Sequence, residues 1–446
     1  MPLYFRASSD LPIDLFPRFL YTLIMYLATP VILYRLALRG LKYRGYFDRW
    51  RERYGFFNDP GIHGSIWVHA VSMGEVNAAV PLIEALMRRY AGVPFVITTI
   101  TPTGSERVQK LFGGRVFHVY LPYDLPASVR RFLDRTRPRL GVVMETEIWP
   151  NLFLECASRG VPIVVANARL SAKSLRGYGP VRPLAGRAIR SARYVAAQSP
   201  SDFKRLLELG ADPARLSIVG NVKFDMAVPA ELATRGRELR AGWGAHRPVW
   251  IAASTHEGEE LPVLKAHAVV LRRFPDALLL IAPRHPERFK PVAQACRSFG
   301  YATRTRSEDE CANSATQCFV VDSMGELLRY YAAADVAFVG GSLVEIGGHN
   351  VLEAAAQAVP VVVGPNTFNF AEITQSLIEA GGAVRAADAD QLGPAILRLL
   401  SDSPDRQRRG EAARNVFERE QGAVGRTMTI IDEVLGSGVE RLAGGA

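Results

Sequence analysis

Cysteine is scarce in this sequence. The chain has 446 residues but only four cysteines, Cys156, Cys296, Cys311 and Cys318, and no two of them form a CxxC pair. This spacing provides neither a disulfide framework nor a cysteine-based metal site. We therefore expect ordinary thiols in a reducing compartment.

Two common nucleotide-binding fingerprints are absent. There is no GxxxxGK[ST] and no GxGxxG that opens a helix, which excludes a P-loop and a dinucleotide fingerprint. The run THEGEE begins like a zinc-protease motif, but Glu260 stands four positions after His256, where that motif needs histidine. Asp388 and Asp390 form the Asp-x-Asp pattern of metal-dependent sugar transferases. They directly precede an expected helix, so a helix cap is the favoured interpretation.

Acidic residues are outnumbered by basic ones. The 54 Lys and Arg exceed the 44 Asp and Glu, and the net charge is +10. This excess favours an acidic partner: nucleic acid, a membrane surface or a phosphorylated substrate. Hydrophobic residues make up 48% and charged residues 22%, which excludes a disordered chain. The length predicts about two or three domains.

Charge is missing altogether from residues 19–34, FLYTLIMYLATPVILY. The run is a little short of the ~20 residues that span a bilayer, but flanking arginines can snorkel outward. Seven basic residues follow it: Arg35, Arg39, Lys42, Arg44, Arg49, Arg51 and Arg53. This positive charge would keep the rest of the chain in the cytoplasm. The alternatives are a helix packed on the protein body and a cleavable signal peptide; Asp10 and Asp14 weigh against the latter.

Beyond residue 60, short apolar runs alternate with amphipathic stretches. We expect strands at 65–71, 94–100, 115–122, 140–147, 162–168, 194–199, 216–221, 249–255, 277–284, 318–323, 336–342 and 359–365. Apolar strands separated by helices predict parallel sheets that are covered on both faces. The polar, strand-free segment 227–248 divides two such series. The predicted fold class is therefore α/β, with two doubly wound Rossmann-like domains.

Polar clusters follow the strands of the first series. Glu75, in SMGE, stands where a helical pattern begins. A carboxylate there either complements the helix dipole by ~0.3–1 kcal/mol or accepts a proton as a general base. Ser72 could already cap that helix, and Gly74 would let a ligand approach the backbone. Both interpretations of Glu75 stay open.

Two further carboxylates, Glu145 and Glu147 in METEIWPN, end a strand that looks buried. Burying a carboxylate is costly unless it is paired. A structural ion pair is one interpretation, and Lys223 in NVKFD, at another strand end, is a plausible partner.

The second series ends its strands with APRHPERF, SMGE and EIGGHNVLEAAA. Asn350 and Glu353 form a capping-box pattern, but the two glycines before them also suit an anion at a helix N-terminus. Arg284 offers a permanent, forked cation that suits a phosphate. Because ligands bind at the carboxyl ends of strands in such sheets, these clusters favour nucleotide binding.

Taken together, SMGEVNAA, METEIWPNL, NVKFD, APRHPERF and GGSLVEIGGHNVLEAAA resemble the 3-deoxy-D-manno-octulosonic acid (Kdo) transferases of lipopolysaccharide biosynthesis, from the N-terminus to about residue 420. The resemblance implies a GT-B fold, in which two Rossmann-like domains face a central cleft behind an N-terminal membrane-anchor helix. It also implies transfer of Kdo from CMP-Kdo to a lipid A precursor, lipid IVA, with inversion and without metal or cofactor. The location that it implies is the cytoplasmic face of the inner membrane, with a peripheral or single-pass anchor.

Position by position, the resemblance makes Glu75 the proton acceptor, and Glu145 and Lys223 the pair that stabilises the transition state. The residues that it assigns to CMP are Pro283, Arg284, Met324, Gly325, Glu326, Asn350, Val351, Leu352 and Glu353. The domains that it implies are an anchor at 1–44, an acceptor-binding domain at 45–225, a CMP-sugar-binding domain at 226–424, and a C-terminal helix and tail at 425–446.

The sequence leaves two other functions open. The first is a GT-B transferase that uses a different nucleotide sugar, against which METEIWPN and NVKFD argue. The second is a non-catalytic, membrane-bound module that binds nucleotides or nucleic acid. No basic–aromatic stripe outside residues 1–54 supports nucleic acid, so we expect no such partner.

Overall fold

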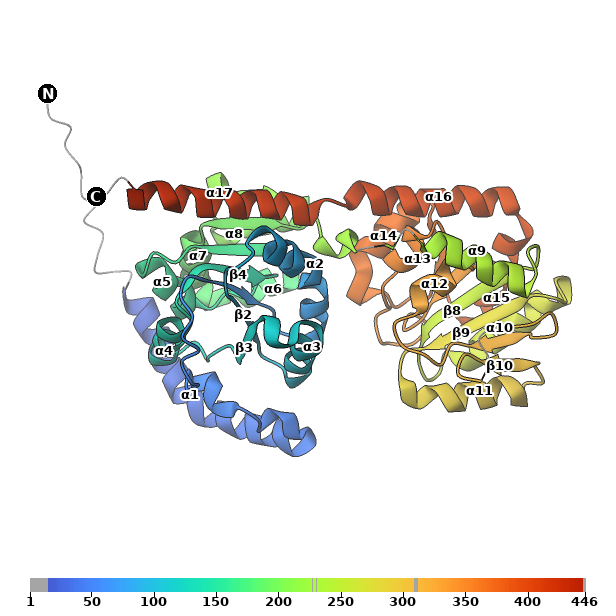
Figure 1. Cartoon of the computed structure of the whole chain (residues 1–446), viewed down its shortest axis with the longest axis horizontal. Helices are drawn as coiled ribbons and strands as arrows, with labels where there is room; N and C mark the ends of the chain where they lie inside the picture. Colours follow the sequence, from blue (N-terminus) through green and yellow to red (C-terminus); the bar gives the residue numbers. More distant parts are fainter. Residues whose placement is uncertain (1–14, 227, 230, 309–311, 444–446) are drawn as a thin grey trace, which may run out of the picture. The chain divides into compact units, whose positions relative to one another are not determined.

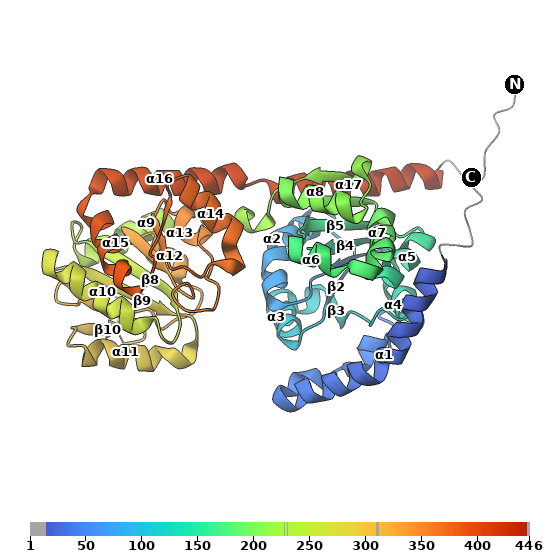
Figure 2. The same cartoon turned by 180° about the vertical axis from the view of Figure 1, so that it is seen from behind.

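The computed structural model describes residues 15–226, 228–229, 231–308 and 312–443. The chain forms two compact units: residues 1–226 together with 421–446, and residues 227–420. Each unit contains a seven-stranded parallel sheet between layers of helices (Figures 1 and 2). The predicted α/β class with two doubly wound domains is confirmed.

The sheet of the first unit has the order β3-β2-β1-β4-β5-β6-β7. Its strands are β1 (Ser65–His69), β2 (Phe95–Thr99), β3 (Phe117–Tyr120), β4 (Pro138–Met144), β5 (Ile163–Ala168), β6 (Tyr194–Ala197) and β7 (Leu216–Ile218). β1, β2 and β5 are buried along their whole length. Burial on both faces explains why these strands appear in the sequence as unbroken apolar runs.

Nine α-helices of the first unit lie among the described residues. They are α1 (Leu15–Lys42), α2 (Met73–Arg89), α3 (Pro102–Phe112), α4 (Pro126–Thr136), α5 (Pro150–Ser158), α6 (Ala172–Gly177), α7 (Arg182–Ser191), α8 (Pro200–Leu209) and α17 (Ala423–Ala443). α3, α4, α5 and α8 each begin with proline, whose fixed φ suits a first turn and whose missing N–H costs nothing there.

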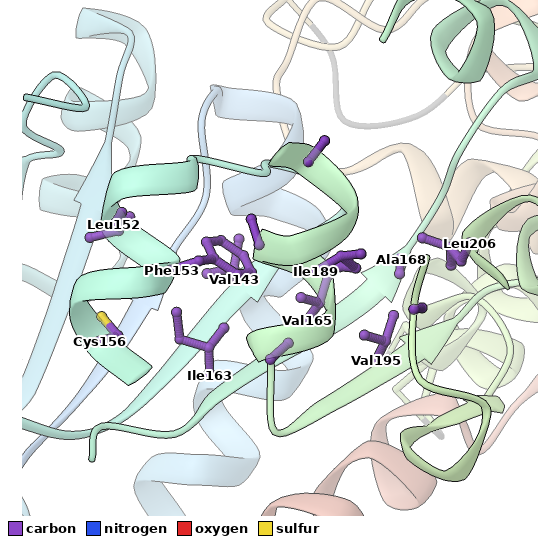
Figure 3. Close-up of a cluster of buried hydrophobic side chains, with 14 of the residues drawn as sticks. Val143, Leu152, Phe153, Cys156, Ile163, Val165, Ala168, Ile189, Val195 and Leu206 are labelled. Carbon is purple, nitrogen blue, oxygen red and sulfur yellow. The ribbon is translucent and has the colours of Figure 1, made fainter. Parts of the chain in front are cut away.

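The two faces of the first sheet have separate cores. Ile66 and Val68 of β1 pack with α2, α3 and α17, whereas Trp67 between them packs with α4, α5, α7 and α8. Figure 3 shows part of the second core, in which Val143 of β4 lies beside Phe153 of α5. The last helix of the chain, α17, therefore returns to the first unit and completes one of its helical layers.

The sheet of the second unit has the order β10-β11-β9-β8-β12-β13-β14. Its strands are β8 (Val249–Thr255), β9 (Leu278–Pro283), β10 (Thr303–Thr305), β11 (Cys318–Val320), β12 (Val336–Val339), β13 (Val361–Val363) and β14 (Ala383–Arg385). The two edge strands, β10 and β14, were not expected from the sequence, because each has only three residues and includes an arginine.

Helices cover both faces of the second sheet as well. They are α9 (Leu232–Trp243), α10 (Glu260–Arg273), α11 (Phe289–Ser298), α12 (Leu327–Tyr331), α13 (Leu352–Ala356), α14 (Ala371–Glu379), α15 (Ala389–Ser401) and α16 (Ser403–Glu420). α10, α11 and α15 bury apolar side chains against one face. On the other face, Phe319 of β11 contacts Trp243 of α9 and Tyr330 of α12.

α1 is the most apolar helix at the surface of the first unit. Within it, Pro17–Leu41 is long and apolar enough to cross a membrane, by length and composition. Residues 1–14, the first part of the predicted anchor, lie outside the described residues.

Candidate active site

The strand order of the first sheet reverses between β1 and β4, which are adjacent and parallel. In doubly wound sheets, ligands bind at this switch point, outside the carboxyl ends of the strands. The loop after β1 leads to Glu75 in the first turn of α2, and Glu145 directly follows β4. The fold therefore brings two of the predicted catalytic residues to the same point.

Glu75 is held by the start of α2. Ser72 is the N-cap of the helix, as the sequence predicted, and its hydroxyl accepts the Glu75 N–H at 3.5 Å. The Val71 N–H donates to Glu75 Oε2 at 2.8 Å, whereas Oε1 has the longer 3.5 Å contact with Ser72 Oγ. The helix-terminal role of Glu75 therefore occupies mainly one oxygen and leaves the other for chemistry.

Burial raises the pKa of Glu75 to about 7. The negative charges of Glu145 and Glu147 add to this rise, and the hydrogen bonds from Val71 and Ser72 oppose it. A general base works best when its pKa lies near the operating pH. The site can therefore ionise Glu75 at neutral pH and still give it enough basicity to accept a proton.

Glu145 has a left-handed backbone, with φ of 58°. Non-glycine residues rarely adopt this conformation, and such strain is concentrated at functional sites. Burial raises the pKa of Glu147, and the charge of Glu145 raises it further. The Trp149 side chain opposes this rise. Glu147 is therefore set beside a second carboxylate, and the ion pair with Lys223 stays a prediction.

Lys223 reaches this region by another route. It lies on the short 3₁₀ helix η6 (Val222–Asp225), which follows β7 at the edge of the sheet and packs against α2. Asn167, at the end of β5, is buried with φ of 55°, and its Oδ1 accepts the Val222 N–H at 3.1 Å. This bond holds η6 toward the middle of the sheet, against the helix that carries Glu75.

The last residue of the NVKFD motif has a structural role. The Asp225 carboxylate accepts the N–H groups of Gly422 and Val424, at the start of α17. It therefore caps the helix that completes the first unit. One motif holds both the predicted Lys223 and the cap of α17.

The second sheet has its own switch point, between β8 and β12. Pro283 ends β9, and the Arg284 N–H donates to Thr255 O at the end of β8, at 3.0 Å. Residues 324–326 follow β11, and residues 350–353 follow the loop after β12. All the segments predicted to bind CMP therefore lie along one edge of this sheet.

Glu259, which lies in the THEGEE run and has no role assigned from the sequence, organises the loop after β12. Its side chain is fully buried. Its two oxygens accept four backbone N–H groups at 2.7–3.1 Å, those of His256, Gly341, Ser342 and Leu343. A Cβ at Gly340 would lie 2.9 Å from Glu259 Oε2 and 2.6 Å from Ser254 O, so this close approach needs glycine. The glycine pair in VGGS was the available signal in the sequence.

Three histidines, also unassigned from the sequence, gather in the same region as Arg284. The rings of His256 and His349 lie nearly parallel, with centroids 5.0 Å apart, and His285 meets His256 edge-on at 5.2 Å. The Nε2 atoms of His256 and His349 are 2.7 Å apart, so one must donate a proton to the other. These four side chains line one part of the sheet edge, where Arg284 is a permanent cation and the histidines offer ring nitrogens for hydrogen bonds.

The protonation of His256 and His349 depends on the charges near them. Burial lowers the pKa of His349 to about 4, and the positive charges of His256 and Arg284 lower it further. Burial lowers the pKa of His256 as well, with His285 and Arg284 adding to the shift. An anion bound there would oppose both shifts, because it favours the charged form of histidine.

In place of the predicted capping box, the Asn350 side chain contacts the first residue of α13, whose N-cap is Val351. Its Oδ1 accepts the Leu352 N–H at 3.1 Å, and its Nδ2 donates to Glu353 Oε1 at 3.2 Å. Burial raises the pKa of Glu353, whereas Asn350 and the charge of Arg284 lower it. The side chains of Val351 and Leu352 are buried, so they could meet a ligand only through their backbone. α13 has five residues, so the positive charge at this edge comes mainly from side chains.

The SMGE segment of the second unit, residues 323–326, differs from that of the first unit in the environment of its glutamate. Met324 is exposed, and Gly325 has φ of 86°. Burial disfavours ionisation of Glu326, but the Ser323 hydroxyl and Arg306 outweigh it, so the pKa of Glu326 is lower than usual. Glu326 also pairs with Arg329 at 2.9 Å. Its carboxylate is thus already occupied within the protein.

The Asp-x-Asp pattern is a helix cap, as predicted. The Asp388 side chain accepts the N–H groups of Asp390 and Gln391 at the start of α15. Among the described residues, no group of three or more His, Cys, Asp or Glu side chains is arranged to hold a metal ion.

Comparisons with known proteins agree with this architecture. Residues 48–226 match the family model "3-Deoxy-D-manno-octulosonic-acid transferase (kdotransferase)", and residues 263–416 match "Glycosyl transferases group 1". The chain is 43% identical to a 3-deoxy-D-manno-octulosonic acid transferase of Haemophilus influenzae, over 94% of this chain and 99% of that protein. It is 38% identical to the transferase of the same name from Bordetella pertussis, over 90% of this chain and 99% of that protein.

A solved structure shows the same fold at low sequence identity. A glycosyltransferase from Rickettsia africae superposes with a TM-score of 0.54 at 13% identity, over 84% of this chain and 99% of that chain. At this identity the likeness concerns the fold alone. It agrees with the two-domain GT-B class predicted from the sequence.

Proposed function

Because the chain belongs to the 3-deoxy-D-manno-octulosonic acid transferase family, we propose that it transfers Kdo from CMP-Kdo to a lipid A precursor, lipid IVA. The proposed location is the cytoplasmic face of the inner membrane, where residues 1–44 attach the protein. The proposed division of labour assigns the acceptor to residues 45–225 and CMP-Kdo to residues 226–424, with residues 425–446 as a closing helix and tail.

The observation that carries this proposal is the position and acidity of Glu75. It stands at the switch point of the first sheet, with Oε1 only loosely engaged, and its pKa is raised to about 7. In the proposed reaction, Glu75 takes the proton of an acceptor hydroxyl. The hydroxyl oxygen forms a bond to the anomeric carbon of Kdo, the bond from that carbon to the phosphate oxygen breaks, and CMP leaves with the electron pair. A direct displacement of this kind inverts the anomeric configuration.

The second unit supports the proposal through its charge. The leaving CMP carries a growing negative charge, and preorganised cations placed near such charge usually contribute most to catalysis. Arg284 is a permanent cation, and His256 and His349 gain basicity when an anion approaches. Glu353, held by Asn350, suits the diol of the ribose. Arg284 and the two histidines can oppose the phosphate charge without a metal ion.

Glu145 and Lys223 are proposed to stabilise the transition state in the first unit. The strained backbone of Glu145 fixes its carboxylate close enough to Glu75 to raise the pKa of that residue. Lys223 lies on the element that packs against α2 and could balance the two carboxylates.

The test is mass spectrometry of the lipid products after the full-length protein is incubated with CMP-Kdo and a tetraacylated lipid A precursor. We expect the acceptor to gain the mass of whole Kdo units, whose number the spectrum also counts. Parallel reactions with UDP-sugars distinguish the alternative donor. Transfer from a UDP-sugar but not from CMP-Kdo would disprove the proposed donor, and CMP-Kdo binding without any product would favour a non-catalytic module.

A further inference from the structure

α1 has two different faces over residues 17–41, whose side chains the structure describes. The residues that are shielded by the protein recur every three or four positions: Arg18, Tyr21, Thr22, Met25, Ala28, Thr29, Ile32, Leu36 and Gly40. The opposite face is apolar and exposed, with Phe19 at 65%, Leu27 at 69% and Leu41 at 78% exposure. A helix that packs on a soluble domain normally has a polar outer face. The apolar outer face of α1 therefore indicates contact with something other than water.

The N-terminal part of α1 is hydrogen-bonded to the body of the first unit. The Tyr21 hydroxyl donates to Asp124 Oδ2 at 3.0 Å, and Arg18 Nε donates to Asn151 Oδ1 at 3.1 Å. Asp124 and Asn151 are themselves buried, and Asp124 accepts the N–H groups of Asn151 and Leu152 in the first turn of α5. These contacts belong to the folded core of the unit.

The C-terminal part of α1 is held by the same unit. Gly40 lies so close to the Phe47 ring that a Cβ would meet it at 2.4 Å, and the Tyr43 hydroxyl just after the helix donates to Glu106 of α3. Figures 1 and 2 show α1 running along the outside of the first unit, with its beginning beside α4 and α5. Both parts of the helix are therefore fixed to one compact body.

This arrangement is incompatible with a helix that spans a bilayer. From Arg18 to Leu41 a helix rises about 35 Å, which would cross the ~30 Å hydrocarbon layer. If the basic residues after α1 stayed on one side, Arg18 and Tyr21 would emerge on the other, far from Asp124 and Asn151. Those hydrogen bonds could not exist in a spanning helix.

Charge indicates which surface the exposed face meets. Arg35, Arg39, Arg44 and Arg51 are exposed at the C-terminal end of α1 and just beyond it, beside the exposed Trp50. Interfacial helices combine an apolar face with flanking basic side chains, and each such side chain near an anionic leaflet strengthens binding about fivefold. By contrast, Arg53 is buried and stacks over Tyr120 at 4.2 Å, so it takes no part in this surface.

We propose that α1 lies in the plane of an anionic lipid bilayer, with its apolar face inserted into one leaflet. Both ends of the helix then stay on the side of the membrane where the first unit lies. The proposal takes from the proposed function only that residues 1–44 bind a membrane. It replaces the single-pass alternative by a monotopic attachment.

The test uses full-length protein reconstituted on the outside of sealed vesicles that contain phosphatidylglycerol. Cysteine is introduced at one end of the exposed face by Phe19→Cys or at the other end by Leu41→Cys, each in a Cys311→Ser background. The remaining native cysteines, Cys156, Cys296 and Cys318, are buried. Each protein is labelled with the fluorophore NBD, and dithionite, which does not cross the bilayer, is added outside.

We expect dithionite to remove the fluorescence of both positions to the same extent. Leu261→Cys, on the exposed surface of α10, serves as the control that reports the outside orientation of the second unit. A label at residue 19 that resists dithionite while those at 41 and 261 react would overturn the in-plane arrangement and leave membrane attachment standing. Failure of the unlabelled protein to bind any vesicle would overturn both.

A second measurement tests the charge of the surface. Replacing Arg35 and Arg39 by glutamine should weaken binding to phosphatidylglycerol vesicles about 30-fold and leave binding to neutral phosphatidylcholine vesicles unchanged. The matched control is the pair Arg272→Gln and Arg273→Gln, exposed at the end of α10 in the second unit, which makes the same change in net charge. Equal loss in both double variants would overturn the role of the α1 surface, as would a dimer that shields α1 and binds no lipid.

Discussion

Glu75, in the first turn of α2, and Glu145, directly after β4, follow two neighbouring strands of the first sheet, and the charge of Glu145 acts on Glu75. Burial, together with the charge of Glu145, raises the pKa of Glu75 to about 7. The two carboxylates are separated by 70 positions in the sequence, and it is the reversal of strand order between β1 and β4 that brings them together. The acid–base property of Glu75 is thus a consequence of the topology as well as of its own burial.

Replacing Glu75 by glutamine should abolish transfer. Glutamine keeps the shape of the side chain and can still accept the Val71 N–H, but it cannot take a proton from the acceptor. We expect kcat to fall by about 10²–10⁴-fold, the usual contribution of a general base. The matched control is Glu84→Gln, an acid on the same helix that pairs with Arg115, which should keep normal turnover. Near-normal activity of Glu75→Gln, with CMP binding and thermal stability intact, would remove Glu75 from the mechanism.

The pH dependence of the rate should also report the pKa of Glu75. Protonated Glu75 cannot act as a base, so kcat/KM should fall about tenfold per pH unit below a pKa near 7. In Glu145→Gln one negative neighbour is lost, ionisation of Glu75 becomes easier, and its pKa falls. The acid limb of the pH profile should therefore move to lower pH, whatever the maximal rate of the variant. A limb that stays in place in Glu145→Gln would show that the titrating group is not coupled to Glu145.

Much of this candidate site could be predicted from the sequence, because local sequence patterns mark the residues that form it. Apolar runs that end in SMGE, METE or APRH show which residues follow a strand, and a parallel sheet places all such residues at one edge. The cap formed by Ser72 and the cap formed by Asp388 depend on residues two or three positions away, and both were predicted correctly.

The remaining features depend on contacts that no local pattern contains. Glu259 meets amides 82–84 positions away, and His256 meets His349 across 93 positions. The position of α1 on the first unit also depends on such contacts. Its apolar composition predicts contact with lipid, but it does not predict the hydrogen bond from Tyr21 to Asp124. In each case, tertiary contacts decide the role of a residue that is unremarkable in its own segment.

Arg284 should control donor binding. Replacing it by glutamine removes the permanent cation beside His349 and Glu353, and a charge-assisted bond of 1.5–3 kcal/mol corresponds to a loss of affinity for CMP of about 10–100-fold. Isothermal titration with CMP measures this directly. The control is Arg288→Gln in the same segment, since Arg288 pairs with Glu257 and Glu260 inside the protein. If both variants lose affinity equally, Arg284 acts through the fold of its loop and not through contact with the nucleotide.

The NVKFD motif should separate into two independent roles. Asp225 caps α17 through Gly422 and Val424, so Asp225→Ala should cost about 1 kcal/mol of stability, as the loss of a helix cap does, and lower the melting temperature. Its turnover per folded molecule should remain normal. Lys223→Met keeps the length of the side chain without its charge, and should reduce kcat about 10²–10³-fold, the effect of losing one preorganised charge at a transition state. Its melting temperature should stay close to that of the unmodified protein. The opposite pattern, with a stable inactive Asp225→Ala and an unstable active Lys223→Met, would exchange the two assignments and remove Lys223 from catalysis.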